Sequence, residues 1–247
     1  MDEIRINKYL SEAGFCSRRE ADRKVEAGEV FIDGELAQMG SKVRPGQQVY
    51  VNGQRVEYGQ EPAVLIAFNK PAGIVCTMEK REKNNVIDFL QYPYRIYPIG
   101  RLDKESTGLL LLTNQGDLVN KMMRSGNAHE KEYLVTVNKE VTEEFLKGMR
   151  GGVPILDTVT RKCKVEKIDK KRIRIVLTQG LNRQIRRMCE YFGYRVVALK
   201  RVRIMNISLG NLKEGTYRNV TEEEYRELLA MIAHSSNEPV RYEGDLE

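Results

Sequence analysis

The sequence predicts an α+β protein with two unequal domains, and two observations carry this prediction. Apolar runs typical of strands and amphipathic stretches typical of helices are mixed without a regular strand–helix–strand alternation, which favours a largely antiparallel sheet. A polar stretch with glycine and proline at residues 58–62 separates a short N-terminal part from a larger remainder. We therefore expect a small module at residues 1–60, a larger domain with a mixed sheet at residues 61–234, and a mobile acidic tail at residues 235–247.

The composition argues against membrane, secreted and nucleotide-binding classes. The longest uninterrupted apolar runs are six residues, whereas a membrane span needs about 18. The chain begins with acidic residues and no apolar segment, so we expect no secretory signal. Its four cysteines are widely separated, which suits free thiols in a reducing compartment better than disulfides or a zinc site. Glycine-rich phosphate and dinucleotide motifs are missing from the sequence. We expect a cytoplasmic protein with no membrane partner.

Positive charge is concentrated in one segment of the chain. Residues 161–203 hold fifteen lysines and arginines against three acids, whereas residues 1–60 hold nine basic and ten acidic residues. A basic cluster of this kind, in a chain of net charge +6, is typical of proteins that bind nucleic acid. The alternative is a solvated basic face without a partner.

The N-terminal part predicts two short helices. An apolar face at residues 4–12 indicates a helix that Gly14 ends. Ser17 and Glu20 then form the pattern of a capping box, which begins a second helix that runs to about Ala27.

Two hairpins follow the helices. Strands at residues 30–32 and 49–51 are each followed by a dipeptide, Asp33-Gly34 and Asn52-Gly53, of the kind that closes a tight turn. With the segment at residues 10–21, this arrangement resembles the alpha-L RNA-binding module of the ribosomal S-four type. The resemblance implies that the N-terminal domain binds RNA.

The basic side chains of this module are the candidates for that binding. They cluster on and near the two helices although the module as a whole is slightly acidic. The alternative is that they only pair with neighbouring acids such as Glu12, Glu20 and Asp22. The candidates are Arg5, Lys8, Arg18, Arg19 and Arg23.

The first half of the larger domain predicts two buried strands. Residues 64–68 form an apolar run that Asn69-Lys70-Pro71-Ala72-Gly73 turns, and a short helix is expected at residues 85–91. Residues 96–100 lead into a polar turn, and residues 109–112 read as a strand buried on both faces.

The second half predicts further strands and helices of the same sheet. We expect helices at residues 117–124 and 142–150, and Gly151-Gly152 ends the second of them. A further helix is expected to begin within residues 179–188 and to end at Gly193. Strands are expected at residues 171–177, 196–199 and 202–209, and in a segment where Tyr133, Val135 and Val137 share one face. Thr221 and Glu224 form a capping box for a C-terminal helix that packs Tyr225, Leu228, Leu229 and Ile232.

The most informative stretch is Gly-Arg-Leu-Asp-Lys-Glu-Ser-Thr-Gly-Leu-Leu-Leu-Leu-Thr-Asn-Gln-Gly-Asp-Leu, at residues 100–118. On spacing alone, Asp103 reads most simply as a turn residue. The stretch resembles the signature of the bacterial ribosomal RNA pseudouridine synthases of the RsuA-like family. The resemblance implies that Asp103 is the catalytic carboxylate. The Asn-Lys-Pro-x-Gly element at residues 69–73 recurs in the same family.

Two further elements match this family in the same order. The Lys-x-Tyr and Gln-Ile-Arg elements imply that Tyr133 and Arg186 are active-site residues, with Arg186 paired to Asp103. Taken alone, Tyr133 reads as a core residue, and Arg186 as a phosphate contact within a run of arginines. The segments at residues 126–133 and 180–188 look closest to the branch called large-subunit ribosomal RNA pseudouridine synthase F.

The resemblance implies a function for the whole chain. The expected reaction is isomerisation of a specific uridine in ribosomal RNA, of the large subunit, to pseudouridine by base flipping, with no cofactor, no metal and a monomeric enzyme. The only histidines are His129 and His234, so the sequence offers no metal cluster. Whether the carboxylate attacks the base or the sugar stays open. The alternatives are a transfer RNA synthase and a non-catalytic ribosome-assembly factor.

Basic and polar residues near the expected pocket complete the candidate RNA contacts. Lysine and arginine side chains bind phosphate through charge, and this binding weakens with salt. The candidates beside the pocket are Arg101, Asn182, Arg183 and Arg187.

Overall fold

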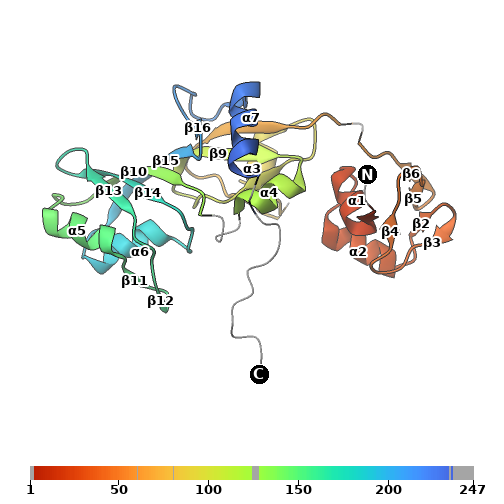
Figure 1. The fold of residues 1–247 in the computed structure, drawn as a ribbon, viewed down its shortest axis with the longest axis horizontal. Coiled ribbons are helices and arrows are strands. Elements are labelled where there is room, and N and C mark those ends of the chain that lie inside the picture. The colour runs from red at the N-terminus through yellow and green to blue at the C-terminus, as the bar shows by residue number, and fades with distance from the viewer. Residues whose placement is uncertain (1–2, 60, 80, 124–127, 234, 236–247) are drawn as a thin grey trace. The chain divides into compact units, whose positions relative to one another are not determined.

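The chain folds as two units in the computed structural model (Figure 1). The structure describes residues 3–59, 61–79, 81–123, 128–233 and 235. The first unit comprises Met1–Ala63 with Tyr92–Arg95 and Asn114–Gly116, and the second comprises Val64–Gln91, Ile96–Thr113 and Asp117–Glu247. Residues 126–127 of the predicted family element, His234 and the predicted tail beyond residue 235 lie outside the described residues.

The N-terminal unit packs two helices against short strands. Its elements are α1 (Ile6–Glu12), α2 (Arg18–Glu26), a two-stranded sheet of β1 (Ile4–Arg5) and β4 (Lys42–Val43), and a four-stranded sheet in the order β3 (Glu35–Leu36), β2 (Val30–Ile32), β5 (Val49–Val51) and β6 (Gln54–Val56). Residues 4–5 were expected to be helical, but they pair with residues 42–43 as a strand. Because residues 4–5 pair with β4, helix α1 begins only at Ile6.

Local sequence signals determine the turns and the helix start of this unit. Asp33 and Gly34 have φ values of 51° and 86°, and Asn52 and Gly53 have 50° and 77°. Successive positive φ values define the tight hairpin turn that each dipeptide predicted. The Ser17 hydroxyl accepts a hydrogen bond from the Glu20 backbone amide at 3.1 Å, so the Ser17 half of the predicted capping box of α2 is confirmed.

A nine-stranded sheet organises the larger unit. Its main order is β13 (Lys164–Lys167), β14 (Arg172–Leu177), β10 (Lys131–Val137), β15 (Val196–Ile204), β9 (Thr107–Thr113), β7 (Leu65–Lys70) and β17 (Tyr217–Asn219), with β16 (Ile207–Ser208) beside β15 and β8 (Tyr97–Ile99) beside β9. All of these pairs are antiparallel except β15 with β9. The predicted mixed, largely antiparallel sheet is confirmed.

Helices and one small hairpin surround this sheet (Figure 1). The helices are α3 (Val86–Leu90), α4 (Gly116–Met123), α5 (Glu143–Gly151), α6 (Gln184–Tyr191) and α7 (Glu222–Met231), and the hairpin pairs β11 (Pro154–Ile155) with β12 (Thr158–Val159). Helix α5 contacts β13, and α6 contacts β11.

The sheet core lies along β7 and β9. The four leucines at residues 109–112 are fully buried, as expected for a strand covered on both faces. Strand β7 continues through Asn69 and Lys70, which were predicted to lie in the following turn. Both side chains are buried, and the Asn69 amide donates to the Leu212 carbonyl at 2.7 Å. The Leu212 carbonyl, from a distant loop, gives the Asn69 side chain a hydrogen-bond partner, so this polar residue can occupy a buried position in a strand.

Strand β15 is one continuous element where the sequence predicted two. Lys200 and Arg201 were taken as the break between them, but both lie inside β15. At this point β15 runs parallel to β9, with Arg201 opposite Gly108. A Cβ at Gly108 would lie 2.2 Å from the Arg201 carbonyl oxygen, and the φ of Gly108 is +99°. Only glycine therefore allows this close approach of the two strands.

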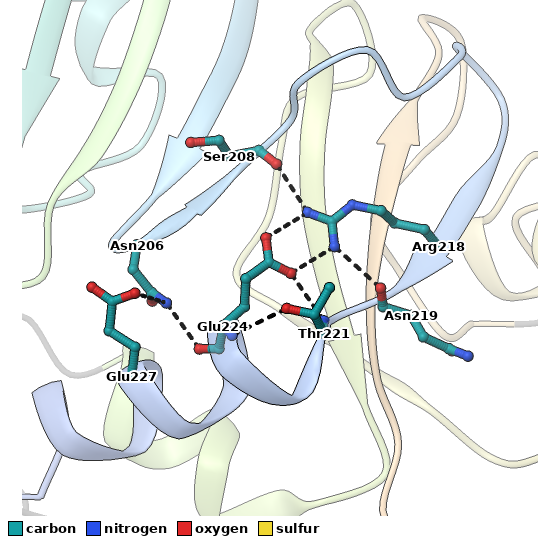
Figure 2. A network of polar contacts seen from close by, with 7 residues as sticks. All are labelled: Asn206, Ser208, Arg218, Asn219, Thr221, Glu224 and Glu227. Carbon is teal, nitrogen blue, oxygen red and sulfur yellow. Dashed lines mark hydrogen bonds and ion pairs between the residues drawn. The ribbon is translucent and has the colours of Figure 1, made fainter.

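The start of α7 is held by a polar network (Figure 2). The Thr221 hydroxyl and the Glu224 carboxylate form the predicted capping box. Glu224 also accepts two hydrogen bonds of 2.7 Å from the Arg218 guanidinium. The helix buries Leu228 and Ile232 as predicted, but Leu229 is 42% exposed, because it lies on the side of α7 away from the core. Within the described residues, no helix is long and apolar enough to cross a membrane.

Candidate active site

The candidate site is a pocket of about 520 Å³ in the larger unit. It is lined by the turn before β9, by β10, by β15 near the parallel seam, and by the loop and first turn of α6. These segments are far apart in the sequence and meet because β9, β15 and β10 are neighbours in the sheet.

The turn that carries Asp103 is fixed from several sides. The Lys104 carbonyl accepts a hydrogen bond of 2.8 Å from the Gly73 backbone amide, and the Ser106 amide donates to the Asp103 carbonyl at 3.0 Å. The Lys70 ammonium, buried at the end of β7, donates to the carbonyls of Pro71 at 2.8 Å and Lys104 at 3.4 Å. Burial lowers the pKa of Lys70, while Asp103 is among the nearby groups that oppose this. The Asn-Lys-Pro-x-Gly element therefore supports the Asp103 turn.

Two guanidinium groups flank the Asp103 carboxylate. The Arg186 Nε lies 3.5 Å from Asp103 Oδ2, and an Arg183 terminal nitrogen lies 3.6 Å from the same oxygen. The Arg186 side chain is only 11% exposed, and it also donates to the Ser106 hydroxyl at 3.3 Å. The predicted pair of Asp103 and Arg186 is present in the structure.

Arg183 was expected to contact RNA, but the structure turns it toward two carboxylates. Its guanidinium lies 3.3 Å from Glu105 as well as close to Asp103. A hydrogen bond that the Glu105 backbone amide donates to its own carboxylate, and then the charge of Arg183, lower the pKa of the Glu105 carboxyl. Arg183 has a φ of +49° immediately before α6, a backbone conformation that sequence periodicity does not reveal.

Tyr133 enters the same pocket from β10. It faces inward with Val135 and Val137, as predicted, and is 9% exposed. In the register of the sheet, Tyr133 lies opposite Arg201 of β15, which in turn lies opposite Gly108 of β9. The ring and the Asp103 turn are thus brought to one place by strand pairing.

A family profile described as RNA pseudouridylate synthase matches residues 64–191, slightly more than half of the chain. The chain belongs to this family. A second profile, described as the S4 domain, matches residues 4–49 of this synthase. The matches confirm the predicted family and the predicted RNA-binding module.

Three relatives extend the likeness over nearly the whole synthase. It is 58% identical to the dual-specificity RNA pseudouridine synthase RluF of Escherichia coli strain K12, over 95% of this chain and 81% of that protein. It is 35% identical to the ribosomal large subunit pseudouridine synthase B of Bacillus subtilis strain 168, over 94% of this chain and 98% of that protein. A crystal structure of a pseudouridylate synthase matches with a TM-score of 0.67 at 28% identity, covering 91% of this chain and 99% of the other.

The other predicted RNA contacts of the synthase fall into two groups. Asn182 and Arg101 line the pocket, and Arg187 donates to Asn182 at 3.1 and 3.2 Å. In the N-terminal unit, Lys8 lies 3.6 Å from Glu12, which is one of the pairings that the alternative interpretation predicted. The remaining candidates of that unit are exposed, and they are Arg5, Arg18, Arg19 and Arg23.

Sequence reasoning missed several residues of the pocket. Lys131 and Arg201 line it beside Tyr133, and Ser106 contacts Arg186. The alternation of β10, in which Lys131 and Tyr133 are two residues apart, was a signal for Lys131. Arg201 carried no such signal, because its strand was predicted to be broken there. Across the described part of the synthase, no three His, Cys, Asp or Glu side chains gather as they would around a metal ion.

Proposed function

We propose that this synthase converts a specific uridine of large-subunit ribosomal RNA into pseudouridine, with Asp103 as the catalytic carboxylate. The observation that carries the proposal is the Asp103 carboxylate between Arg186 and Arg183, in the pocket that also contains the Tyr133 ring. The name of the Bacillus subtilis relative specifies the large ribosomal subunit, which supports this substrate.

The proposed chemistry follows from what the isomerisation needs. The C1′–N1 glycosidic bond must break, the freed base must turn, and C5 must bond to C1′. Asp103 supplies an ionised carboxylate, and the flanking guanidinium groups keep it oriented while the pocket closes on the nucleotide. Tyr133 provides a ring on which the detached base stacks as it turns.

RNA binding provides the free energy to expose the target base. Extruding a base from a folded RNA costs on the order of a few kcal/mol. In the proposal, exposed cations at the pocket rim and in the N-terminal module offset this cost through contacts to phosphate. The contact residues are Arg5, Lys8, Arg18, Arg19, Arg23, Arg101, Asn182, Arg183 and Arg187, with Arg183 also orienting Asp103.

The proposal includes the organisation of the chain. Residues 1–60 act as the RNA-binding domain and residues 61–234 as the catalytic domain, in a monomer that works in the cytoplasm. A monomer suffices because Asp103, Tyr133 and Arg186 all come from one chain.

The test is release of tritium from RNA labelled at uridine C5, because forming the C5–C1′ bond displaces that hydrogen. We expect wild-type protein to release tritium from large-subunit ribosomal RNA, and Asp103→Asn to release none while it binds the same RNA with nearly unchanged affinity. Asp117→Asn serves as a matched control, since Asp117 lies outside the pocket in the first turn of α4.

Two outcomes would change the proposal. Full activity of Asp103→Asn would remove Asp103 from the mechanism. Tight binding by the wild-type protein without tritium release would favour a non-catalytic assembly factor. A parallel reaction with transfer RNA tests a second substrate, which the words "dual-specificity" in the name of the Escherichia coli relative make worthwhile.

A further inference from the structure

The floor of the pocket holds an arginine that the mechanism above does not use. Arg201 is 2% exposed and lines the pocket at the seam between β15 and β9. Its Nε donates to the Leu109 carbonyl at 2.7 Å, but one terminal nitrogen is buried without a hydrogen-bond partner. A buried polar group without a partner is costly, so this nitrogen is a donor that awaits a ligand.

A second cation faces the same space. Lys131 lies two residues before Tyr133 on the inward face of β10 and lines the pocket. Its ammonium makes one long hydrogen bond, of 3.4 Å, to the His129 carbonyl. Burial, and then the charge of Arg201, lower the pKa of Lys131 to about 8.

The charge of these two cations is not compensated by the protein. Neither Lys131 nor Arg201 forms an ion pair with any residue that the structure describes, whereas Arg183 and Arg186 are paired with Asp103. A buried arginine and a half-buried lysine without an acid raise the free energy of the empty pocket. A ligand that carries or develops negative charge would remove this cost.

We propose that Lys131 and Arg201 bind the carbonyl oxygens of the flipped uracil and stabilise the negative charge that this base acquires when the glycosidic bond breaks. The inference rests on the proposed function and names a role for two residues of the same site.

The electron balance of the reaction supplies the required charge. When the C1′–N1 bond breaks, its electron pair goes to N1 and spreads onto the uracil carbonyl oxygens, while C1′ becomes electron-poor and is accommodated by the Asp103 carboxylate. C5 then donates an electron pair to C1′, the proton on C5 leaves to solvent, and N1 takes up a proton. The negative charge on the base exists only between these two steps. Donors placed at its oxygens therefore bind the transition state more tightly than the bound uridine.

The location of the two cations favours the base over a phosphate. Arg201 is opposite Tyr133 in the sheet, and a base stacked on that ring lies deep in the pocket. A backbone phosphate remains near the pocket mouth, where the candidate phosphate contacts Arg101 and Arg183 are exposed at the surface. Arg201, at 2% exposure, is out of reach of such a phosphate.

The test compares two leaving groups in single-turnover reactions at saturating protein. RNA with uridine at the target position is compared with RNA carrying 5-fluorouridine there, because fluorine makes uracil a better leaving group. Loss of the starting nucleoside is followed for wild type, Lys131→Met and Arg201→Lys, with Lys200→Met as the matched control. Lys200 neighbours Arg201 in β15 but does not line the pocket. Thermal unfolding of each variant monitors folding.

We expect Lys131→Met to slow cleavage of the uridine substrate by about 10²-fold, as for loss of one donor to a developing oxyanion. The loss should be clearly smaller with 5-fluorouridine, while the Kd for RNA stays within about twofold and Lys200→Met behaves as wild type. If Arg201→Lys is poorly folded, the inference is judged on the rates and RNA affinity of Lys131→Met alone.

Three results would overturn the inference. An equal loss on both substrates would indicate a structural role, and an unchanged rate with weakened, salt-dependent RNA binding would indicate a phosphate contact. An unchanged rate with unchanged binding would exclude a role for Lys131. Failure of the wild-type protein to consume the uridine substrate would be distinct from these, since it would overturn the proposed function and the inference with it.

Discussion

At the scale of single residues, the pocket separates paired cations from unpaired ones. Arg183 and Arg186 lie within 3.6 Å of Asp103, and Arg183 also pairs with Glu105, so two carboxylates balance their two charges before any ligand arrives. Arg201 is buried and Lys131 is half-buried, and neither forms an ion pair with a residue that the structure describes. The first pair positions a carboxylate, and the second leaves donors available to the substrate, at a cost in folding free energy.

This cost leads to a prediction for the free energy of unfolding of Lys131→Met. The pKa of Lys131 falls from 10.5 in the unfolded chain to about 8 in the folded protein. A difference of about 2.5 units at about 1.36 kcal/mol each sets an upper bound of roughly 3 kcal/mol on the penalty at neutral pH. We therefore expect Lys131→Met to be more stable than wild type in urea unfolding at pH 7 while being slower in catalysis.

The free energy of unfolding should also change with pH in a direction that the lowered pKa of Lys131 determines. Between pH 8 and 10.5 the unfolded chain keeps a proton on Lys131 that the folded protein has lost, so wild-type stability rises with pH in this window. The stability advantage of Lys131→Met should shrink across the same window. A variant that is less stable than wild type at pH 7 would contradict the burial penalty.

At the scale of elements, helix caps and the pairing of strands decide how the larger unit is built. The α7 cap combines a helix signal that is local in sequence with the Arg218 guanidinium from the middle of β17 (Figure 2). The parallel seam of β9 and β15 depends on Gly108, and it brings Arg201 under the pocket. The pairing of β9 with β15 links segments that no local sequence pattern connects.

The α7 cap predicts an acid-dependent loss of stability. Hydrogen bonds from Arg218 are the largest cause that lowers the pKa of Glu224 below 4.5. Because the folded pKa is depressed, the stabilisation is complete above pH 4.5 and is lost as the pH falls through the folded pKa. We expect Glu224→Gln to lower the free energy of unfolding by about 1 kcal/mol at pH 7, since the pair is partly exposed.

Urea unfolding at pH 7 and near pH 3 checks this expectation. The difference between wild type and Glu224→Gln should be smaller at the lower pH. Glu223→Gln is the control, because Glu223 lies in the same first turn of α7 and makes no bond to Arg218. An equal effect of both substitutions would assign the stabilisation to the helix dipole rather than to Arg218.

At the scale of the whole molecule, each of the two units has a core of its own among the described residues. One cluster of buried residues lies within the N-terminal unit, around Leu10, Val30 and Val49. Another lies within the larger unit, around Leu109, Leu111 and Ile207. A unit with its own core can fold by itself.

Removal of residues 1–60 should therefore weaken RNA binding without preventing the folding of the larger domain. We expect a fragment of residues 61–247 to unfold cooperatively, to retain the active-site pocket, and to bind ribosomal RNA at least about tenfold more weakly than the full chain, with a smaller salt dependence. Circular dichroism and filter binding at several salt concentrations measure both properties. A fragment that fails to fold would contradict the independence of the two domains.

Much of this architecture was available from the sequence, because its signals are local. The dipeptides Asp33-Gly34 and Asn52-Gly53, the caps at Ser17 and Thr221, and the buried run of leucines in β9 each depend on a few neighbouring residues. The ordered motifs around Asp103, Tyr133 and Arg186 also identify the family from the sequence alone.

The tertiary structure decided how these pieces meet. Lys70 and Arg201 are charged residues that local patterns place outside strands, yet Lys70 is the last residue of β7 and Arg201 lies inside β15, because carbonyl oxygens from elsewhere in the chain accept their hydrogen bonds. The acceptor for Arg201 is 92 residues away in the sequence. Pairing at such a distance depends on loop closure and on the fit of whole strands, which no short window contains. The sequence by itself thus determined the family, the turns and the Asp103 signature, whereas only the folded chain determined which cations line the pocket beside Tyr133.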